Sequence, residues 1–284
     1  MAKIAPLAEI MERQYSRLTG LGTGSCAGCG GGIAAQALAR AVDRIGINQD
    51  NVATVMGVTC SGAPVGLLNY GTVWAAHGRA PSVATGLKLA RPDLTVITIQ
   101  GDGDALAIGG NHFIHAARRN IDITIIVNNN FTYGRTGGQY GPTTPKGAKA
   151  TSAPYSLIEN PFNPCSLAEC SGATFVARGT SYHVVELIDI FEKAIRHHGC
   201  SFVEVITQCP VSFGRYNPDM MGKTPPDMLK WMRDHIISID KARKMGTGEI
   251  DPRFIRGILV DRERPEYGDE YQGIIKKARE GNGG

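Results

Sequence analysis

The sequence predicts an α/β protein with a doubly wound, mostly parallel sheet. Short runs rich in Val, Ile and Thr alternate along the chain with segments whose apolar residues recur at helical spacing. Continuous apolar strands of this kind are buried on both faces, which is typical of parallel sheets covered by helices on each side. The 284 residues are 42% hydrophobic and 20% charged, as in an ordinary globular protein that builds its own core.

Four elements account for the first part of this alternation. Residues 33–45 repeat apolar side chains at the spacing of a helix, and residues 51–59 form a short apolar run typical of a buried strand. The small-residue stretch 82–91 is then expected to be helical, and it leads to a strand over 94–100 that is rich in Thr, Val and Ile. Strands that alternate with helices in this way favour parallel crossover units.

Four further elements continue the pattern. Residues 105–120 are expected to form a helix that leads to a strand over 123–129. Residues 184–198 have the spacing of an amphipathic helix, and the Val- and Ile-rich run 202–208 follows as a strand. All of the predicted strands are therefore separated by segments long enough for a parallel crossover.

Two regions fall outside the alternation. The stretch from Tyr133 to Pro164 is rich in Gly, Pro, Thr and Ser without a clear period, and loops of this length usually carry function or contact a partner. After Pro225 the composition becomes charged. We therefore expect one main domain over residues 1–224 and a helical or irregular appendage over 225–284 that packs on the domain or on a partner subunit.

Composition excludes several classes of protein. The net charge of +4 comes with mixed signs and no long basic run, so neither a nucleic-acid groove nor a nucleic-acid partner is expected. No window offers the roughly 18 uncharged apolar residues of a membrane helix, and the N-terminus has no apolar core followed by a cleavage site. We expect a soluble cytoplasmic protein that has no membrane partner. Seven Cys without an export signal favour free thiols or metal ligands over disulfides.

Unusual residues follow four of the predicted strands at the point where each strand ends. They are Cys60, Asp102, the run of three Asn over 128–130, and Cys209. In an open parallel sheet, ligands bind in the crevice outside the carboxyl ends of the strands. Two cysteines, a carboxylate and a group of amides are therefore expected to meet along one edge of the sheet.

Asp102 and Asn130 carry oxygen ligands suited to a divalent cation. Gly101 and Gly103 let the backbone turn sharply and come close to a bulky anion. Mg²⁺ takes few protein oxygens together with phosphate oxygens, so an Asp, an Asn, a main-chain carbonyl and a diphosphate would complete its octahedron. The sequence Gly-Asp-Gly is equally compatible with a plain strand-to-helix turn, so alone it is a weak indication.

The spacing between the Gly-Asp-Gly sequence and the Asn run is more informative than either sequence alone. From Gly103 to Asn129 there are 25 intervening residues, and GDG followed by about that interval and then NN resembles the thiamine diphosphate-binding motif of thiamine-dependent enzymes. The resemblance implies that Asp102, Asn130 and the main-chain carbonyl of Thr132 hold Mg²⁺, which anchors the diphosphate. Because three consecutive Asn leave the register open, Asn128 and Asn129 are alternatives to Asn130.

Four of the seven cysteines are candidate metal ligands. Cys26 and Cys29 form a C-x-x-C pair in a Gly-rich turn before a helix, and Cys60 and Cys209 follow strands. Thiolates bind zinc as well as iron-sulfur clusters, and the spacing alone does not choose between them. The other three are expected to be structural, since buried free Cys is common: Cys165, Cys170 and Cys200.

Six motifs in order extend the similarity to nearly the whole chain. They are Cys26-Ala-Gly-Cys29-Gly, Thr59-Cys60-Ser61-Gly62, His77-Gly78-Arg79, GDGDALAIGGNHFIHAARRN, NNNFTYGRTGGQYGPTTP, and Gln208-Cys209-Pro210 followed by GRYN. Together with RPEY in the tail, they resemble the beta subunit of 2-oxoacid:ferredoxin oxidoreductases. The main domain would then have the thiamine diphosphate-binding fold.

This resemblance implies roles for particular residues. One [4Fe-4S] cluster would be bound by Cys26, Cys29, Cys60 and Cys209, close to thiamine diphosphate. The residues with an expected catalytic role are Cys60, His77 and Arg135. Contacts to the cofactor are implied for Val58, Thr59, Cys60, Ser61, His77, Gly101, Gly103, Asp104, Gly134 and Arg135.

The resemblance also implies an activity and partners. In this family a 2-oxoacid is decarboxylated oxidatively, coenzyme A takes the acyl group, and ferredoxin takes the electrons. The cofactor carries that chemistry and the protein orients it. The carboxylate that activates thiamine is a Glu of the partner alpha subunit, and we find no Glu at a strand end of this chain. An alpha subunit, with gamma and delta subunits in some relatives, is therefore an expected partner.

Arg135 bears on the substrate. The sequence after Asn160 and the segment from Cys209 to Asn217 look most similar to enzymes that act on 2-oxoglutarate. Arg135 stands where the family usually has Leu or Met, and a guanidinium could pair with the distal carboxylate of a dicarboxylic substrate. Equally, it could bind a diphosphate oxygen or point into solvent.

Three alternatives remain open at this stage. A thiamine-dependent decarboxylase or synthase without a redox cluster would use its cysteines structurally or for zinc. The same enzyme class could act on pyruvate or branched-chain 2-oxoacids. A non-catalytic electron-transfer or scaffold subunit would not need Asp102 and Asn130, which this chain keeps.

Overall fold

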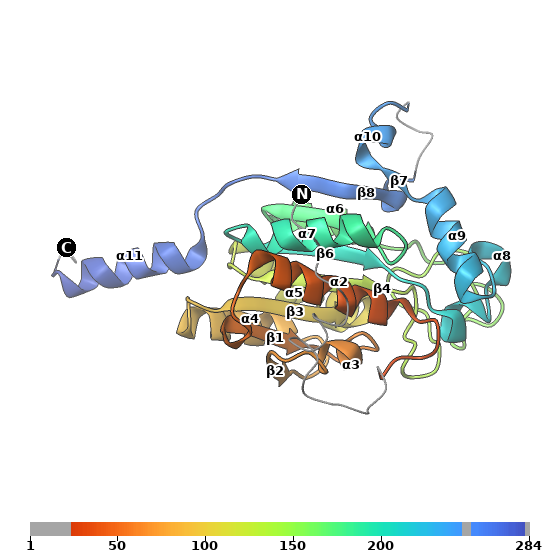
Figure 1. Ribbon diagram of the computed structural model, residues 1–284, viewed down its shortest axis with the longest axis horizontal. Coiled ribbons are helices and arrows are strands. Elements are labelled where there is room, and N and C mark those ends of the chain that lie inside the picture. Colours follow the sequence, from red (N-terminus) through yellow and green to blue (C-terminus); the bar gives the residue numbers. More distant parts are fainter. Residues whose placement is uncertain (1–23, 246–250, 282–284) are drawn as a thin grey trace.

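The computed structural model describes residues 24–245 and 251–281. Within these residues, eight strands form one sheet in the order β2-β1-β3-β4-β6-β5-β8-β7 (Figure 1). The first six strands of this order pair in parallel, and β8 runs antiparallel to β5. The predicted α/β class with a mostly parallel sheet is confirmed.

The four predicted strands are present with slightly different ends, and four further strands join them. The strands are β1 Val52–Met56, β2 Gly71–Trp74, β3 Thr95–Gly101, β4 Thr124–Asn129, β5 Phe175–Thr180, β6 Ser201–Ile206, β7 Ile237–Ser238 and β8 Ile255–Asp261. Strand β1 ends three residues before the predicted position, and Val58 and Thr59 of the segment that follows line a cavity.

The predicted helices are present, and several short ones lie in the second half of the chain. The α-helices are α2 Gly30–Ile45, α3 Gly62–Val65, α4 Ala80–Ala90, α5 Gly110–Arg118, α6 Pro164–Ser171, α7 Val184–Arg196, α8 Pro218–Met221, α9 Pro225–His235, α10 Ile239–Ala242 and α11 Tyr267–Arg279. Single turns of 3-10 helix are η1 Gln49–Asn51 and η4 Pro252–Phe254, and π-helical turns are η2 Gly103–Ile108 and η3 Pro210–Gly214.

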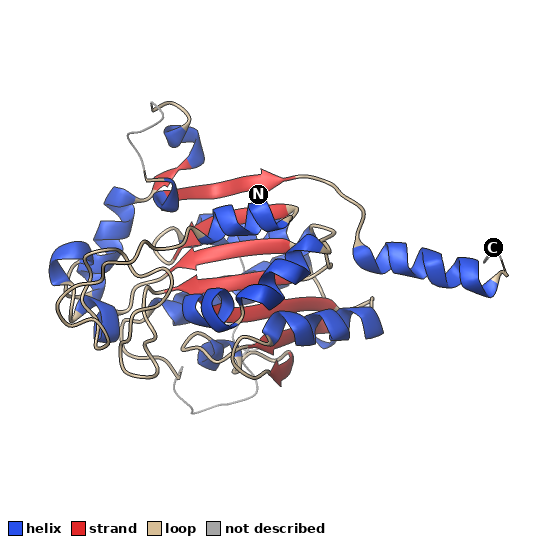
Figure 2. Cartoon of the chain, turned by 180° about the vertical axis from the view of Figure 1, so that it is seen from behind, coloured by secondary structure: helices blue, strands red, loops and turns tan. Residues whose placement is uncertain are grey.

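Helices cover both faces of the sheet. Helices α2 and α7 bury Leu38 and Phe191 against one face, in a core shared with β1, β3, β4 and β6 (Figure 1). Helices α4, α5 and α6 cover the other face, where Phe113 and Phe202 pack at a ring separation of 5.2 Å (Figure 2). Strands β1, β4, β5 and β6 are thus buried along their whole length, as continuous apolar strands require.

One predicted helix is divided. The expected helix over 105–120 is the π-helical turn η2 followed by α5, and Gly109 separates them. At Gly109 a Cβ would lie 2.5 Å from the carbonyl oxygen of Asp104 and 2.9 Å from that of Gly78, so the backbone segments meet at a distance that only glycine permits. π-helical turns occur frequently at functional sites.

The residues of the expected appendage contribute to the sheet and to a third core. Strand β8 extends the sheet beyond β5, with a register shift between Val176 and Ala177. Met228 and Met232 of α9 are buried together with Phe213 of η3. The first part of the 225–284 segment therefore packs on the main domain.

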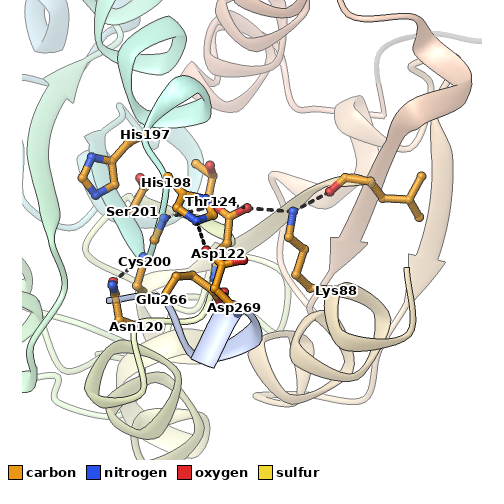
Figure 3. Close-up of polar contacts among 12 residues, drawn as sticks. Lys88, Asn120, Asp122, Thr124, His197, His198, Cys200, Ser201, Glu266 and Asp269 are labelled. Atoms are coloured by element: carbon orange, nitrogen blue, oxygen red, sulfur yellow. Dashed lines mark hydrogen bonds and ion pairs between the residues drawn. The ribbon is translucent and has the colours of Figure 1, made fainter. Parts of the chain in front are cut away.

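The last helix, α11, extends away from the sheet (Figure 1). Only its start is attached, at the amino ends of the strands. Figure 3 shows the polar contacts there: Glu266 Oε1 accepts a hydrogen bond from the amide of Asp122 at 3.0 Å, and His198 Nε2 lies 2.8 Å from Asp269 Oδ2. Lys88 Nζ lies 2.7 Å from Asp122 Oδ2.

No helix among the described residues is both long enough and apolar enough to cross a membrane. The N-terminal stretch, for which no export signal is expected, lies outside the described residues.

Candidate cofactor and metal site

A cavity of about 150 Å³ lies at the carboxyl ends of β1, β3 and β4. Its wall contains Asp102, Asn130 and Thr132, which the sequence predicts as metal ligands, and every predicted cofactor contact except Ser61. The π-helical turn η2 begins there, directly after β3. Three of the residues predicted to meet at the strand ends, Cys60, Asp102 and Asn130, thus line one cavity.

Asp102 is a buried carboxylate suited to a cation. Its Oδ2 accepts a hydrogen bond from Thr143 Oγ1 at 2.5 Å. Burial raises the pKa of this carboxyl to about 7, although the hydrogen bond from Thr143 acts to lower it. No Lys, Arg or His lies within 4.0 Å of it in the part of the chain that the structure describes, so a metal ion would supply the missing positive charge.

The turn after β4 selects one of the three Asn residues. Asn130 lines the cavity, whereas Asn128 and Asn129 do not. The side chain of Asn129 is instead bonded within the protein, since its Nδ2 donates to Glu204 at 2.7 Å. Phe131 then has a φ of +62°, a left-handed conformation that is rare for a bulky residue and common at functional sites. Asn130 is therefore the Asn placed to bind a metal ion.

Asp104 lines the cavity, yet its carboxylate is already occupied. It accepts hydrogen bonds from the backbone amides of Val58 at 3.2 Å and Gly78 at 2.8 Å, and from Gln100 Nε2 at 2.7 Å. It is also paired with Nδ1 of His77. Asp104 thus joins three segments of the cavity wall and orients His77, whose other ring nitrogen is left to face a ligand.

Gly103 is required because an aromatic ring covers it. A Cβ at this position would lie 2.1 Å from the ring of Tyr133, whose hydroxyl is 3.4 Å from the carbonyl oxygen of Gly103. Tyr133 lines the cavity and meets the His77 ring edge-on, with centroids 6.4 Å apart. Tyr133 was not predicted as a wall residue, although it lies in a Gly-rich loop, which is a feature typical of ligand sites.

The four candidate cysteine ligands line a second cavity of about 250 Å³. Cys26 and Cys29 reach it from the turn before α2, Cys60 from the segment after β1, and Cys209 from the start of η3. A backbone hydrogen bond of 3.1 Å from Gly30 to Gln208 joins the first segment to the last. Residues that are 183 positions apart in the sequence, from 26 to 209, thus share one cavity.

The sulfurs are spread more widely than in a zinc site. Among the described residues, the one group of three or more His, Cys, Asp or Glu ligand atoms within 4.8 Å of one another is His198, Glu266 and Asp269. With Zn–S bonds of about 2.3 Å, four thiolates around zinc would lie about 3.8 Å apart. No three of the four cysteine sulfurs, all of which belong to described residues, lie within 4.8 Å of one another.

Two of the four cysteine sulfurs accept hydrogen bonds from backbone amides, and burial changes the pKa of a third. Cys29 caps helix α2 and its Sγ accepts from the amide of Gly31 at 3.4 Å, while Cys209 Sγ accepts from Ser212 at the same distance. Burial, reinforced by the neighbouring thiols, raises the pKa of Cys60 to about 11. Because a metal binds the thiolate, assembly of a metal centre would release protons here.

The two cavities share a wall. Cys60, Asn130, Gly134 and Arg135 line both of them. A Cβ on Gly134 would lie 3.4 Å from Cys60 Sγ and 3.7 Å from Cys209 Sγ, so the backbone at Gly134 passes close to both sulfurs. A ligand in one cavity would therefore be a near neighbour of a metal centre in the other.

Some of the predicted residues lie elsewhere. Ser61 is buried beside α2, where its Oγ would lie 3.3 Å from a Cβ on Gly31, and it does not line the first cavity. Cys165 and Cys200 are buried free thiols, as expected for structural residues. Cys170 is exposed, which corrects the expectation of a buried structural role, because it lies on the outer side of α6.

Comparison with known proteins gives a consistent result. Residues 44–205 match the family model described as the thiamine pyrophosphate enzyme, C-terminal TPP binding domain. The 2-oxoglutarate synthase subunit KorB of Methanocaldococcus jannaschii is 42% identical over 254 residues, which cover 89% of this chain and 93% of the relative. The 2-oxoacid:ferredoxin oxidoreductase subunit beta of Saccharolobus solfataricus is 40% identical over 246 residues, 86% of this chain and 78% of the relative.

A solved structure is similar over the same length. It is the 2-oxoglutarate:ferredoxin oxidoreductase from Magnetococcus marinus with 2-oxoglutarate, coenzyme A and succinyl-CoA bound. One of its chains superimposes with a TM-score of 0.81 at 29% sequence identity, over 95% of this chain and 90% of that one. The residues that line the first cavity all lie within the matched residues 44–205, whereas the second cavity is also lined by residues before and after that match.

Proposed function

The chain belongs to the thiamine pyrophosphate enzymes and, among them, to the beta subunits of 2-oxoacid:ferredoxin oxidoreductases, and on this premise we propose a reaction for it. The reaction is the conversion of 2-oxoglutarate, coenzyme A and oxidised ferredoxin to succinyl-CoA, CO₂ and reduced ferredoxin. The relatives named for 2-oxoglutarate, at about 42% identity over most of the chain, support this substrate over pyruvate and branched-chain 2-oxoacids.

The shared wall of the two cavities is the observation that supports this reaction. Oxidative decarboxylation needs an electron acceptor next to the cofactor. Cys60 and Gly134 line both the cavity with the thiamine motif and the cavity with four cysteines. A [4Fe-4S] cluster held by Cys26, Cys29, Cys60 and Cys209 would lie beside thiamine diphosphate, whereas zinc has no redox chemistry to offer.

The first cavity has residues suited to the magnesium and diphosphate part of thiamine diphosphate. Mg²⁺ would be held by Asp102, Asn130 Oδ1 and the carbonyl of Thr132, with diphosphate oxygens completing its shell. When bound, thiamine supplies the electron sink for decarboxylation of a 2-oxoacid. His77, oriented by Asp104, lies where it can donate a hydrogen bond to the diphosphate.

The site needs a partner subunit. Glu204 is buried and paired with Arg178, so it is not available to activate the cofactor. Val58 in the cavity wall is 48% exposed, and Trp74 and Ile108 at the same edge of the sheet are exposed as well. Large apolar side chains around a cavity mouth mark a protein interface. An alpha subunit that covers this edge would supply the missing Glu.

Further components follow from the same proposal. Ferredoxin is the electron acceptor, and gamma and delta subunits are possible members of the complex. Residues 1–224 bind the cofactors, and residues 225–284 form an appendage on the domain or a partner subunit. All seven cysteines are free thiols, which suits a reducing compartment such as the cytoplasm.

The proposal is tested by anaerobic purification of this chain with its co-purifying partners. Iron, sulfide, magnesium and thiamine diphosphate are quantified on one sample, and turnover is compared with that of the chain alone. We expect about four iron atoms and one thiamine diphosphate per copy, after subtraction of clusters on the partners, and no turnover by the chain alone. Zinc in place of iron would contradict the electron-transfer step, and full turnover by the single chain would contradict the shared site.

Arg135 is expected to select a dicarboxylic substrate. It is exposed and lines both cavities, so its guanidinium can reach a distal carboxylate. A hydrogen-bonded charge pair contributes about 1.5 to 3 kcal/mol, so Arg135→Leu should raise KM for 2-oxoglutarate about 10- to 100-fold. The KM for 2-oxobutyrate, which lacks that carboxylate, should change little.

The control for this prediction is Arg119→Leu, which removes an exposed guanidinium at the far end of α5. Steady-state kinetics of both variants with both substrates decide the matter. Equal changes in the two KM values would remove Arg135 from substrate recognition.

A further inference from the structure

A chain of buried polar side chains leads from the first cavity into the interior of the protein. It runs from Asp102 through Thr143, Asn129 and Glu204 to Arg178, and all five side chains are buried. Thr143, Asn129 and Glu204 do not line either cavity. These three residues therefore cannot contact a ligand in either cavity. Hydrogen bonds nevertheless connect them to Asp102, which lines the first cavity.

Glu204 determines which way the Asn129 amide faces. Its Oε1 accepts from Asn129 Nδ2 at 2.7 Å, and its Oε2 accepts from Arg178 Nε at 2.7 Å. An ionised carboxylate only accepts hydrogen bonds, so the NH₂ group of Asn129 must face Glu204. The carbonyl oxygen of Asn129 consequently faces the opposite way, toward the cavity residues.

The Asn129 carbonyl oxygen fixes the turn that carries the other metal ligands. It accepts a hydrogen bond from the backbone amide of Phe131 at 3.1 Å. Phe131 is the residue in the left-handed conformation, and its neighbours Asn130 and Thr132 point into the cavity. A bulky residue stays in this conformation only when its surroundings hold it there.

Thr143 connects the same oxygen to Asp102. Its Oγ1 lies 2.9 Å from Asn129 Oδ1 and 2.5 Å from Asp102 Oδ2. Both neighbours are acceptors when Asp102 is ionised, and a hydroxyl has a single proton to share between them. Thr143 thus holds Oδ2 of Asp102 in place.

Arg178 anchors the far end of the chain of hydrogen bonds. Besides Glu204, its guanidinium donates to the carbonyl oxygens of Pro252 and Ile255 at 2.8 Å and to Asn163 Oδ1 at 2.7 Å. Asn163 ends the long loop that contains Thr143. Arg178 therefore connects both the loop and the C-terminal segment to the carboxylate of Glu204.

We propose that Asn129 and Thr143 are positioning residues for the magnesium and diphosphate site, held in one orientation by the buried Arg178–Glu204 pair. The inference rests on the proposed function, since it assumes that Asp102 and Asn130 bind the metal. The sequence left Asn129 open as an alternative metal ligand. In this inference Asn129 instead holds the metal ligands Asp102 and Asn130 in position. Partners of metal ligands commonly contribute 10- to 100-fold to metal affinity.

The test is a titration with Mn²⁺, followed by electron paramagnetic resonance, of the co-purified complex depleted of metal and supplied with thiamine diphosphate. Thr143→Val removes the hydroxyl and keeps the shape, and it should weaken Mn²⁺ binding about 10- to 100-fold. Thr143→Ser restores the hydroxyl and should bind nearly as the unaltered complex does. Thr98→Val is the matched control, because Thr98 is fully buried and its hydroxyl has no hydrogen-bond partner among the described residues.

Glu204→Gln provides an independent variant. A glutamine whose oxygen keeps Arg178 presents its NH₂ group to Asn129, which must then flip and turn its own NH₂ group toward Phe131 and Thr143. We expect Mn²⁺ affinity to fall about 10-fold. Arg178 keeps three other acceptors in this variant, so the complex should assemble and carry the test even where Thr143→Val does not.

The outcomes separate this inference from the proposed function. Equal Mn²⁺ affinity in the unaltered, Thr143→Val and Glu204→Gln complexes would overturn the inference alone. Equal losses in Thr143→Val and Thr143→Ser, or in Thr98→Val, would also overturn it, since the hydroxyl would not be the cause. An unaltered complex that binds neither Mn²⁺ nor thiamine diphosphate would overturn the proposed function as well.

Discussion

Asp102→Asn should remove thiamine diphosphate from the purified complex and abolish turnover. Asp102 is the buried carboxylate of the first cavity and has no cationic neighbour among the described residues. An amide fits the same space but lacks the negative charge that a divalent cation requires. Because residues that merely support metal ligands contribute 10- to 100-fold, loss of a ligand itself should weaken Mg²⁺ binding by more than about 100-fold.

The measurement is the thiamine diphosphate content of the purified variant and its Mg²⁺ dependence in the assay. The variant should keep the fold. Burial already raises the pKa of the Asp102 carboxyl to about 7, and the substitution removes only its negative charge. Asp93→Asn is the control, since Asp93 is an exposed partner of Arg91 far from the cavity. Full retention of cofactor by Asp102→Asn would show that the metal is bound elsewhere.

Cys29→Ser should remove the cluster and leave the thiamine site intact. Cys29 lines the second cavity only, so the residues that we propose to hold Mg²⁺ are untouched. Serine is also a preferred helix N-cap, so the cap of α2 that Cys29 provides is preserved. Iron per copy of this chain should fall from about four to near zero, with loss of ferredoxin reduction, because a serine hydroxyl is a poor substitute for a thiolate.

Cys170→Ser is the matched control, because Cys170 is an exposed thiol on α6 that lies outside both cavities. Iron, thiamine diphosphate and the absorbance near 400 nm are measured on both variants. Unchanged iron in Cys29→Ser would contradict the ligand set, and loss of thiamine diphosphate together with iron would mean that Cys29 acts through the fold.

The position of the candidate site could be predicted, because the carboxyl ends of parallel strands lie side by side. Buried strands are readable as continuous Val and Ile runs, and whatever follows them lies at one edge. Asp102, Cys60 and Cys209 were located in this way. Strand β5 was missed because it contains Arg178, whose burial depends on its pairing with Glu204 and on three further hydrogen-bond acceptors.

Two features of the site could not be predicted. One is which of the three Asn residues lines the cavity, and the other is which side chains hold the metal ligands in position. Which Asn enters the cavity depends on the left-handed Phe131 and on the partner of Asn129, Glu204, which is 75 residues away in the sequence. Thr143 lies in a loop without periodicity. Long-range hydrogen bonds leave no local pattern, so these residues become visible only in three dimensions.

The detached helix α11 implies an uneven distribution of local stability along the chain. Its 13 residues include none that is buried, and Tyr271 and Ile274 are exposed. Isolated helices of this length are marginal in water, because too few hydrogen bonds repay nucleation. Backbone amides toward its end should therefore exchange with deuterated solvent orders of magnitude faster than those of β4 and β6, which open only when the sheet itself does.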